Sequence, residues 1–177
     1  MGRKGTGKTT LARDLVTRTK RTLILDTLGR DYGGGCVVRD PAALAEYYAR
    51  VRHCADFTII ARPTGDALPT AFFQLCTKAE GVWVVVEECD RYCGPSQIEP
   101  SLYWILNYGR QFGISIMGCA RRAASVNRTW TANCDWIVAH QTQEPRDLQY
   151  LTNFMDTTGL EKLAPFQWRR WGTSGIF

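Results

Sequence analysis

The chain has 177 residues, of which 45% are hydrophobic and 22% are charged. These proportions are typical of a globular domain, and they exclude a disordered or fibrous protein; a chain of this length can bury a core without disulfides or metal clips. The formal net charge is +5, with basic residues concentrated near the beginning, which favours an anionic ligand or partner without deciding its kind. No apolar run approaches the length of a membrane span and no signal sequence opens the chain, so we expect one cytosolic domain over residues 1–177.

Short apolar runs alternate with segments of helical periodicity along the chain. We expect strands over 22–25, 57–61, 82–86, 114–117 and 136–139, and a last strand over 166–171. The first five runs are continuous rather than alternating, as in strands that are covered on both faces. The pattern predicts an α/β fold in which a parallel sheet is sandwiched by helices.

The helices expected between these strands have recognisable ends. Asp40 and Pro41 supply a cap and a first-turn proline, and an apolar stripe at i, i+3, i+4 and i+7 follows them. Further helices are expected to begin near Pro69, to run from Pro100 to Phe112, and to begin at Glu144.

Residues 2–9 match the phosphate-binding pattern G-x-x-x-x-G-K-[ST] at every fixed position and lead directly into a helical segment. The glycines let successive backbone N–H groups point into one concavity, and the helix N-terminus adds positive potential. Lys8 is expected to reach the outer phosphates of ATP, and Thr9 to offer its hydroxyl to Mg²⁺. The nucleotide-binding residues predicted here are Gly2, Gly5, Thr6, Gly7, Lys8, Thr9 and Thr10. A flexible opening rich in glycine and lysine is the alternative.

Two acids end the apolar run over 82–86. We expect Glu87 to lie near the metal, where an Asp is more usual, and Glu88 to lie beyond it as the catalytic group that activates water. Two acids at this place could instead cap the next turn. A small-molecule kinase would usually carry an Arg-rich lid and an early Asp for its acceptor, so ATP hydrolysis is favoured over phosphoryl transfer to a metabolite.

Together these motifs resemble the FtsK and HerA superfamily of DNA-pumping ATPases, and within it the genome-packaging ATPases of tailless, membrane-containing phages. The resemblance spans nearly the whole chain. The segments that carry it are the P-loop over 2–9, the strand over 23–26, the strand ending at Glu87 and Glu88, and the segments 108–116, 121–126 and 144–148.

This resemblance implies a P-loop NTPase of the additional-strand catalytic-glutamate type, with strand order 5-1-4-3-2. It also implies a homo-oligomeric ring, commonly a hexamer, that threads double-stranded DNA and meets capsid or portal-vertex proteins in the host cytoplasm or on the virion. Arg110 matches the region that supplies a catalytic arginine finger in trans, although a solvated arginine at a helix end is an alternative. Arg121 occupies the place of a polar sensor, and it could contact phosphate, act as a second finger or bind DNA.

Only Met1 precedes Gly2, whereas a P-loop normally follows the first strand of its sheet. We therefore expect the first strand to be missing from this chain, as in an N-terminally truncated P-loop ATPase domain, unless another segment fills its place. Loss of a central strand leaves buried backbone groups of its neighbours unpaired.

The function predicted from the sequence is an ATP-hydrolysing, DNA-translocating motor that packages a viral genome. Two alternatives belong to other classes. One is a small-molecule or nucleoside kinase, and the other is a phage assembly factor that binds nucleotide as a switch.

Overall fold

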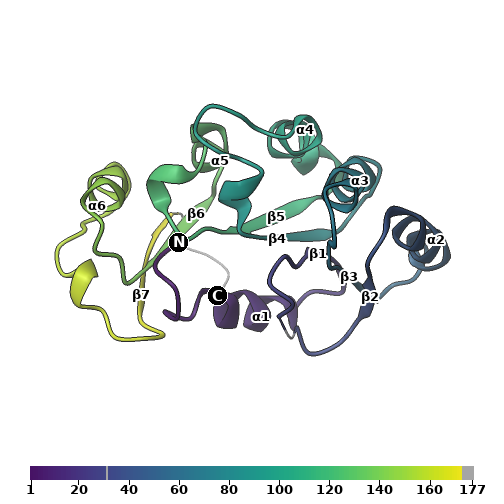
Figure 1. The fold of residues 1–177 in the computed structure, drawn as a ribbon, viewed down its shortest axis with the longest axis horizontal. Helices are drawn as coiled ribbons and strands as arrows, with labels where there is room; N and C mark the ends of the chain where they lie inside the picture. The colour runs from purple at the N-terminus through teal and green to yellow at the C-terminus, as the bar shows by residue number, and fades with distance from the viewer. Residues whose placement is uncertain (31, 173–177) are drawn as a thin grey trace.

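The computed structural model describes residues 1–30 and 32–172. Within this part of the chain the main sheet has five parallel strands in the order β2-β3-β1-β4-β5 (Figure 1). The strands are β1 (Arg21–Leu25), β2 (Cys36–Val38), β3 (Phe57–Ala61), β4 (Trp83–Glu87) and β5 (Ser115–Cys119). The sequence predicted four of them, and β2 was missed because three residues are too few to produce a pattern.

The helices mostly follow their sequence signals. They are α1 (Lys8–Val16), α2 (Pro41–Val51), α3 (Ala67–Cys76), α4 (Pro100–Tyr108), α5 (Arg128–Ala132) and α6 (Pro145–Leu151). Asp40 caps α2 by accepting a hydrogen bond from the Ala43 N–H (2.9 Å), and Glu144 caps α6 through the Asp147 N–H (2.8 Å). The prediction for α3 was wrong at its start, because the helix begins at Ala67, ahead of Pro69. The short α5 was not predicted.

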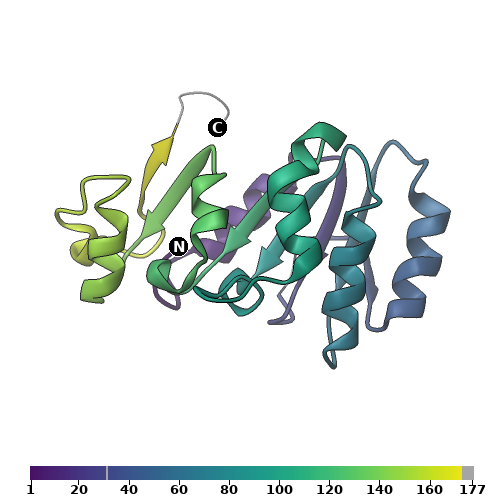
Figure 2. The ribbon, with the colours of Figure 1, turned by 90° about the horizontal axis from the view of Figure 1, so that it is seen from above.

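The two faces of the sheet are covered unequally. Helices α2, α3, α4 and α5 lie side by side over one face, while α1 lies on the other (Figures 1 and 2). Leu23 and Leu25 of β1 point into the large core under the first group, whereas Ile24 packs in the smaller core with α1. Since successive side chains of a strand point to opposite faces, the continuous apolar runs are needed to fill both cores.

The strand expected over 136–139 lies outside the main sheet, in a second unit that is built around a separate two-stranded sheet. It forms β6 (Trp136–His140), which pairs antiparallel with β7 (Trp168–Gly172), a pairing that the sequence did not predict. Helix α6 lies beside this pair, at one end of the molecule (Figure 2). The expected last strand over 166–171 is confirmed as β7, with a start two residues later.

Met1 and Gly2 lie between the carboxyl ends of β5 and β6. The Met1 amino group donates to the carbonyl of Val138 (2.6 Å), and the Met1 carbonyl accepts from the His140 N–H (2.8 Å). On the other side, the Gly2 N–H donates to the Ala120 carbonyl (3.3 Å). In the predicted order 5-1-4-3-2, strand 1 lies between strands 4 and 5. If β1, β4, β5 and β6 correspond to strands 2, 3, 4 and 5, then Met1 and Gly2 occupy the place of strand 1. The arrangement of the sheet therefore agrees with the predicted fold.

In the part of the chain that the structure describes, no helix has the length and apolar character that a membrane span requires.

Candidate nucleotide-binding site

The P-loop folds as a tight arch that leads into α1. Gly5 and Gly7 have φ angles of 81° and 100°, in the left-handed region that glycine adopts most readily. The Gly7 carbonyl accepts the first helical hydrogen bond, from the Leu11 N–H (3.0 Å), and the Thr6 hydroxyl donates back to the Arg3 carbonyl (2.9 Å). The glycine pattern thus produces the backbone conformation that a phosphate-binding loop requires.

Lys8 lies inside this arch. Its ammonium group donates to the carbonyls of Gly2 (2.6 Å) and Arg3 (2.8 Å). Burial lowers the pKa of Lys8, and the nearby Glu87 carboxylate opposes that shift. The loop carbonyls therefore hold a partly desolvated cation over the concavity where phosphate oxygens would bind.

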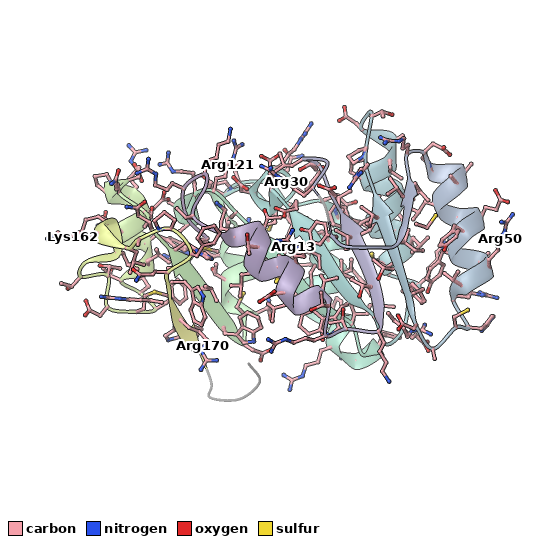
Figure 3. All side chains as sticks on the ribbon, turned by 90° about the horizontal axis from the view of Figure 1, so that it is seen from below. Arg13, Arg30, Arg50, Arg121, Lys162 and Arg170 are labelled. Atoms are coloured by element: carbon pink, nitrogen blue, oxygen red, sulfur yellow. The ribbon has the colours of Figure 1, made fainter. Side chains whose placement is uncertain are left out.

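A pocket of about 410 Å³ opens beside the P-loop. Its lining includes eight of the predicted site residues: Gly5, Gly7, Lys8, Thr9, Thr10, Glu87, Glu88 and Arg121. Gly2 and Thr6 are buried within the loop and do not line this pocket. Figure 3 shows Arg121 and Arg30, both of which line the pocket, together at one edge of the molecule, with Arg13 on α1 beside them.

Glu87, at the end of β4, is almost completely buried, with 2% of its surface exposed. The Tyr32 hydroxyl donates to its Oε1 atom at 2.6 Å. Burial, reinforced by the Glu87 charge, raises the pKa of Tyr32 and raises that of the neighbouring Cys119 thiol to about 12, so both groups stay protonated beside the carboxylate. Neither residue was predicted, since Tyr32 lies in a loop 55 positions away and Cys119 ends another strand.

Glu88 has a left-handed backbone, with φ 50° and ψ 46°, which is uncommon outside glycine and asparagine. Two groups hold its carboxylate: the Thr27 hydroxyl donates to Oε2 (3.1 Å), and Arg121 Nη2 lies 3.3 Å from Oε1. Strained backbone at a pocket is a common mark of a functional residue. The structure shows one contact of Arg121 that the sequence did not suggest, which is the ion pair with Glu88.

The oxygen donors of this pocket fit a magnesium–nucleotide complex. The Thr9 hydroxyl and the Glu87 carboxylate both belong to residues that line it, and Mg²⁺ is usually held by one or two carboxylates together with substrate phosphates and water. Residues 1–30 and 32–172 contain no cluster of three His, Cys, Asp or Glu side chains that could hold a metal by themselves.

The end of β1 carries a second buried acid, Asp26. It accepts hydrogen bonds from the Leu28 and Arg30 backbone N–H groups (3.2 and 3.0 Å) and from Arg62 Nε (2.8 Å). The Arg62 guanidinium also donates to the Arg30 carbonyl, and these contacts order the loop after β1, which brings Leu28 and Arg30 to the pocket wall.

The P-loop is tied to the second unit through His140. This imidazole is 1% exposed, and its Nδ1 atom lies 2.9 Å from the Thr6 carbonyl. Burial lowers the pKa of His140 to about 4, so the ring is neutral near pH 7 and bonds to the carbonyl through an Nδ1–H tautomer. These contacts give His140 a structural role, which is to support the P-loop.

Arg110 lies apart from the pocket. It is exposed in the 3₁₀ turn Gly109–Phe112, which precedes β5, whereas Glu87 and Cys119 lie at the carboxyl ends of β4 and β5. Because these strands are parallel, the turn lies at their amino ends and the pocket lies at their carboxyl ends. Arg110 therefore lies away from the pocket of its own chain, and its predicted role in trans remains a prediction.

No protein-family model matches the chain, and no curated protein matches it. Several solved structures do. The genome packaging NTPase B204 from Sulfolobus turreted icosahedral virus 2, in complex with sulfate, has a TM-score of 0.73 at 17% identity, covering 97% of this chain and 88% of that chain. The same NTPase in complex with ATP-γS has a TM-score of 0.73 at 16% identity, with the same coverage.

B204 from Sulfolobus turreted icosahedral virus, described as a DNA-packaging ATPase, has a TM-score of 0.63 at 12% identity, covering 98% of this chain and 95% of that chain. At these identities the likeness is one of fold, and it agrees with the resemblance found in the sequence. The chain has the α/β fold of a P-loop NTPase such as B204, with a parallel sheet flanked by helices.

Proposed function

We propose that the protein hydrolyses ATP, with Mg²⁺, to drive a DNA-translocating motor that packages a viral genome into a preformed capsid. The observation that carries this proposal is that the P-loop lysine and the two strand-end glutamates line one pocket although about 80 residues separate them in the sequence. The fold shared with solved packaging NTPases supports it.

In this proposal, Lys8 and the P-loop N–H groups neutralise the phosphates, and Thr9 and Glu87 hold Mg²⁺, which withdraws charge from the phosphate oxygens when bound. Glu88 accepts a hydrogen bond from the attacking water. The water oxygen attacks the γ phosphorus, one water proton passes to the Glu88 carboxylate, and the bond to the β–γ bridging oxygen breaks, which yields ADP and inorganic phosphate.

The contacts of Glu88 suggest how its reactivity is controlled. Arg121 and Thr27 together occupy both of its carboxylate oxygens. A terminal phosphate competes with Glu88 for the Arg121 guanidinium, because phosphate and guanidinium pair strongly. Arg121 then moves to the phosphate and leaves one oxygen of Glu88 available to the water.

Translocation requires more than one copy. We propose a ring, most simply a hexamer, in which Arg110 of one copy approaches the nucleotide of its neighbour and double-stranded DNA passes through the centre. Arg110 is exposed near the amino end of β5, whereas the pocket lies at the carboxyl ends of the strands. This position supports a role in trans rather than in cis. A capsid or portal-vertex protein is the further partner that packaging requires.

The test compares ATP binding and ATP turnover in three variants. Lys8→Ala should lose both, and Glu88→Gln should bind ATP while turnover falls at least about 100-fold, the range found when a group that acts mainly in the transition state is removed. Glu80→Gln is the matched control, since Glu80 is exposed next to the amino end of β4 and should leave both quantities unchanged. An unchanged rate in Glu88→Gln would refute its role.

The same assay separates the alternatives. Double-stranded DNA should stimulate ATP consumption by the assembled ring, whereas stimulation by a nucleoside or other metabolite would indicate a kinase. ATP binding without turnover in any assembly would indicate a nucleotide-switched assembly factor. In rings mixed with Arg110→Ala subunits, turnover should fail only at the interfaces that the variant faces.

A further inference from the structure

Phe166 is a large apolar side chain that the core does not bury. It is 62% exposed, and it lies in the wall of the 410 Å³ pocket together with Gly7, Thr10 and Arg13. Exposed aromatic rings at a pocket often contact a ligand, because leaving such a surface in water costs free energy. The proposed roles of the P-loop and the glutamates do not use this residue.

The backbone holds the Phe166 ring in place over the P-loop. Its N–H donates to the Thr6 carbonyl at 3.0 Å, the same oxygen that His140 contacts. The ring packs so closely on Gly7 that a Cβ atom at Gly7 would lie 2.8 Å from Phe166 Cδ1. Phe166 itself has φ 67°, a region that bulky residues rarely adopt. The chain thus adopts an unfavourable conformation that presents an aromatic face beside the phosphate-binding loop.

The position of the ring relative to the acidic groups indicates which part of a nucleotide it meets. Glu87 ends β4 and Glu88 follows it, in the main sheet, and these carboxylates mark the side of the pocket where the terminal phosphate would be cleaved. Phe166 comes from the segment that precedes β7, in the second unit, and packs on Gly7, the residue that caps the start of α1. A nucleotide whose phosphates lie along the P-loop has its base at the end farthest from the cleaved phosphate.

The other exposed apolar residue in the pocket lies at the acidic end. Leu28 is 43% exposed and follows Thr27, whose hydroxyl donates to Glu88. A flat aromatic ring matches the face of a nucleobase, whereas an isolated leucine next to the carboxylates does not. Leu28 therefore serves as a control of similar polarity and exposure in the same pocket.

We propose that Phe166 is the stacking surface for the nucleobase of the bound nucleoside triphosphate. This inference rests on the proposed nucleotide-binding function and adds a residue that recognises the base rather than the phosphates. Stacking is tolerant of base identity, so Phe166 contributes affinity for nucleotides in general.

The experiment compares the affinities of ATP and of inorganic tripolyphosphate, which has the phosphates but no base. Phe166→Ala should weaken ATP binding about 5- to 150-fold, the loss expected for one stacked base, and should change tripolyphosphate binding less than about twofold. Phe166→Tyr should retain ATP affinity, because it keeps the ring. Leu28→Ala should leave the ratio of the two affinities unchanged.

Equal loss of ATP and tripolyphosphate binding in Phe166→Ala would assign the residue to support of the loop and overturn the stacking role. Unchanged binding of both would overturn it as well. Lys8→Ala should weaken both ligands. If the unaltered protein binds neither ligand, the proposed nucleotide function fails, and that result is distinct from a failure confined to Phe166.

Discussion

The two sides of the pocket are held by different parts of the molecule. The P-loop is tied to the second unit, through His140 and Phe166 at the Thr6 carbonyl and through the Arg3 N–H, which donates to Gln141 (3.1 Å). The glutamates are held by the main sheet and its loops, with Tyr32 at Glu87, and Thr27 and Arg121 at Glu88. The side chains that contact the P-loop and those that contact the glutamates thus come mostly from different parts of the molecule, although the Gly2 N–H also joins the P-loop to Ala120, after β5.

This difference predicts two kinds of defect. Loss of a contact around the P-loop should weaken nucleotide binding and leave the turnover of bound ATP less affected. Loss of a contact around the glutamates should slow turnover with little change in affinity. Four predictions follow this division, and they are ordered by their expected effect on the free energy of unfolding.

His140→Ala should have the largest effect. Removal of this buried ring leaves a cavity and an unpaired Thr6 carbonyl, so we expect a loss of about 3 kcal/mol in stability, measured by urea unfolding, and a weaker affinity for ATP. His53→Ala is the control, because His53 is exposed, and its stability should change by less than about 0.5 kcal/mol. A loss below about 1 kcal/mol in His140→Ala would show that the P-loop is supported elsewhere.

The same histidine should make stability depend on pH. Its pKa in the folded chain is about 4, below the ordinary 6.5, so the unfolded chain binds a proton that the folded chain does not bind between these values. The stabilising contribution is complete above pH 6.5 and is lost as the pH falls towards 4, by about 2 kcal/mol between pH 7 and 4.5.

His140→Asn isolates this contribution, since an amide keeps a hydrogen-bond donor near Thr6 and does not titrate. Its stability should fall less steeply over the same range in urea unfolding experiments. Equal slopes for the two proteins would show that other groups cause the pH dependence.

Tyr32→Phe tests the side of the glutamates. It removes the buried hydrogen bond to Glu87 and leaves the protonated Cys119 thiol beside the carboxylate, so we expect a loss of about 1.5 kcal/mol in stability. Turnover should fall about 10-fold with ATP affinity nearly unchanged, because the variant disturbs Glu87, the group proposed to position the metal. A change in affinity without a change in turnover would contradict the separation of the two sides.

Arg121→Ala should have the smallest effect on folding. Its side chain is 62% exposed, and an exposed pair such as that with Glu88 is worth less than about 1 kcal/mol, so urea unfolding should change little. Turnover should nevertheless fall if Arg121 moves to the terminal phosphate. Arg122→Ala is the contrasting variant, because Arg122 pairs with the buried Asp147. Compared with Arg121→Ala, it should lose more stability and have less effect on turnover.

That contrast concerns two adjacent arginines, of which the sequence analysis gave a candidate role only to Arg121. The segment over 144–148, which carried part of the resemblance, supplies Glu144 and Asp147 as partners of Arg122 (2.9 and 2.8 Å). Asp147 also accepts from the Ala124 N–H (2.9 Å). Arg122 is held against α6 by these contacts, which leaves Arg121 as the arginine that contacts Glu88.

The parts of the site that the sequence predicted are those in which consecutive residues carry the chemistry. The P-loop is continuous from Gly2 to Thr9, and Glu87 and Glu88 end an apolar strand, so spacing and periodicity were sufficient to find them. Tyr32 and Thr27 lie in loops without periodicity, and Phe166 lies in the turn before β7, where the sequence indicated the start of a strand. Nothing local shows what these residues contact, and the positions of their elements in the fold decide it.

The sequence by itself determined the α/β class, most of the strands and the pair of motifs that meet at the pocket, because short-range steric and hydrophobic preferences repeat along the chain. Tertiary structure alone decided that β6 pairs antiparallel with β7, that Met1 and Gly2 lie between β5 and β6, and that Phe166 packs on Gly7. These contacts join residues at least 28 positions apart, and their energies depend on which surfaces the whole fold brings together.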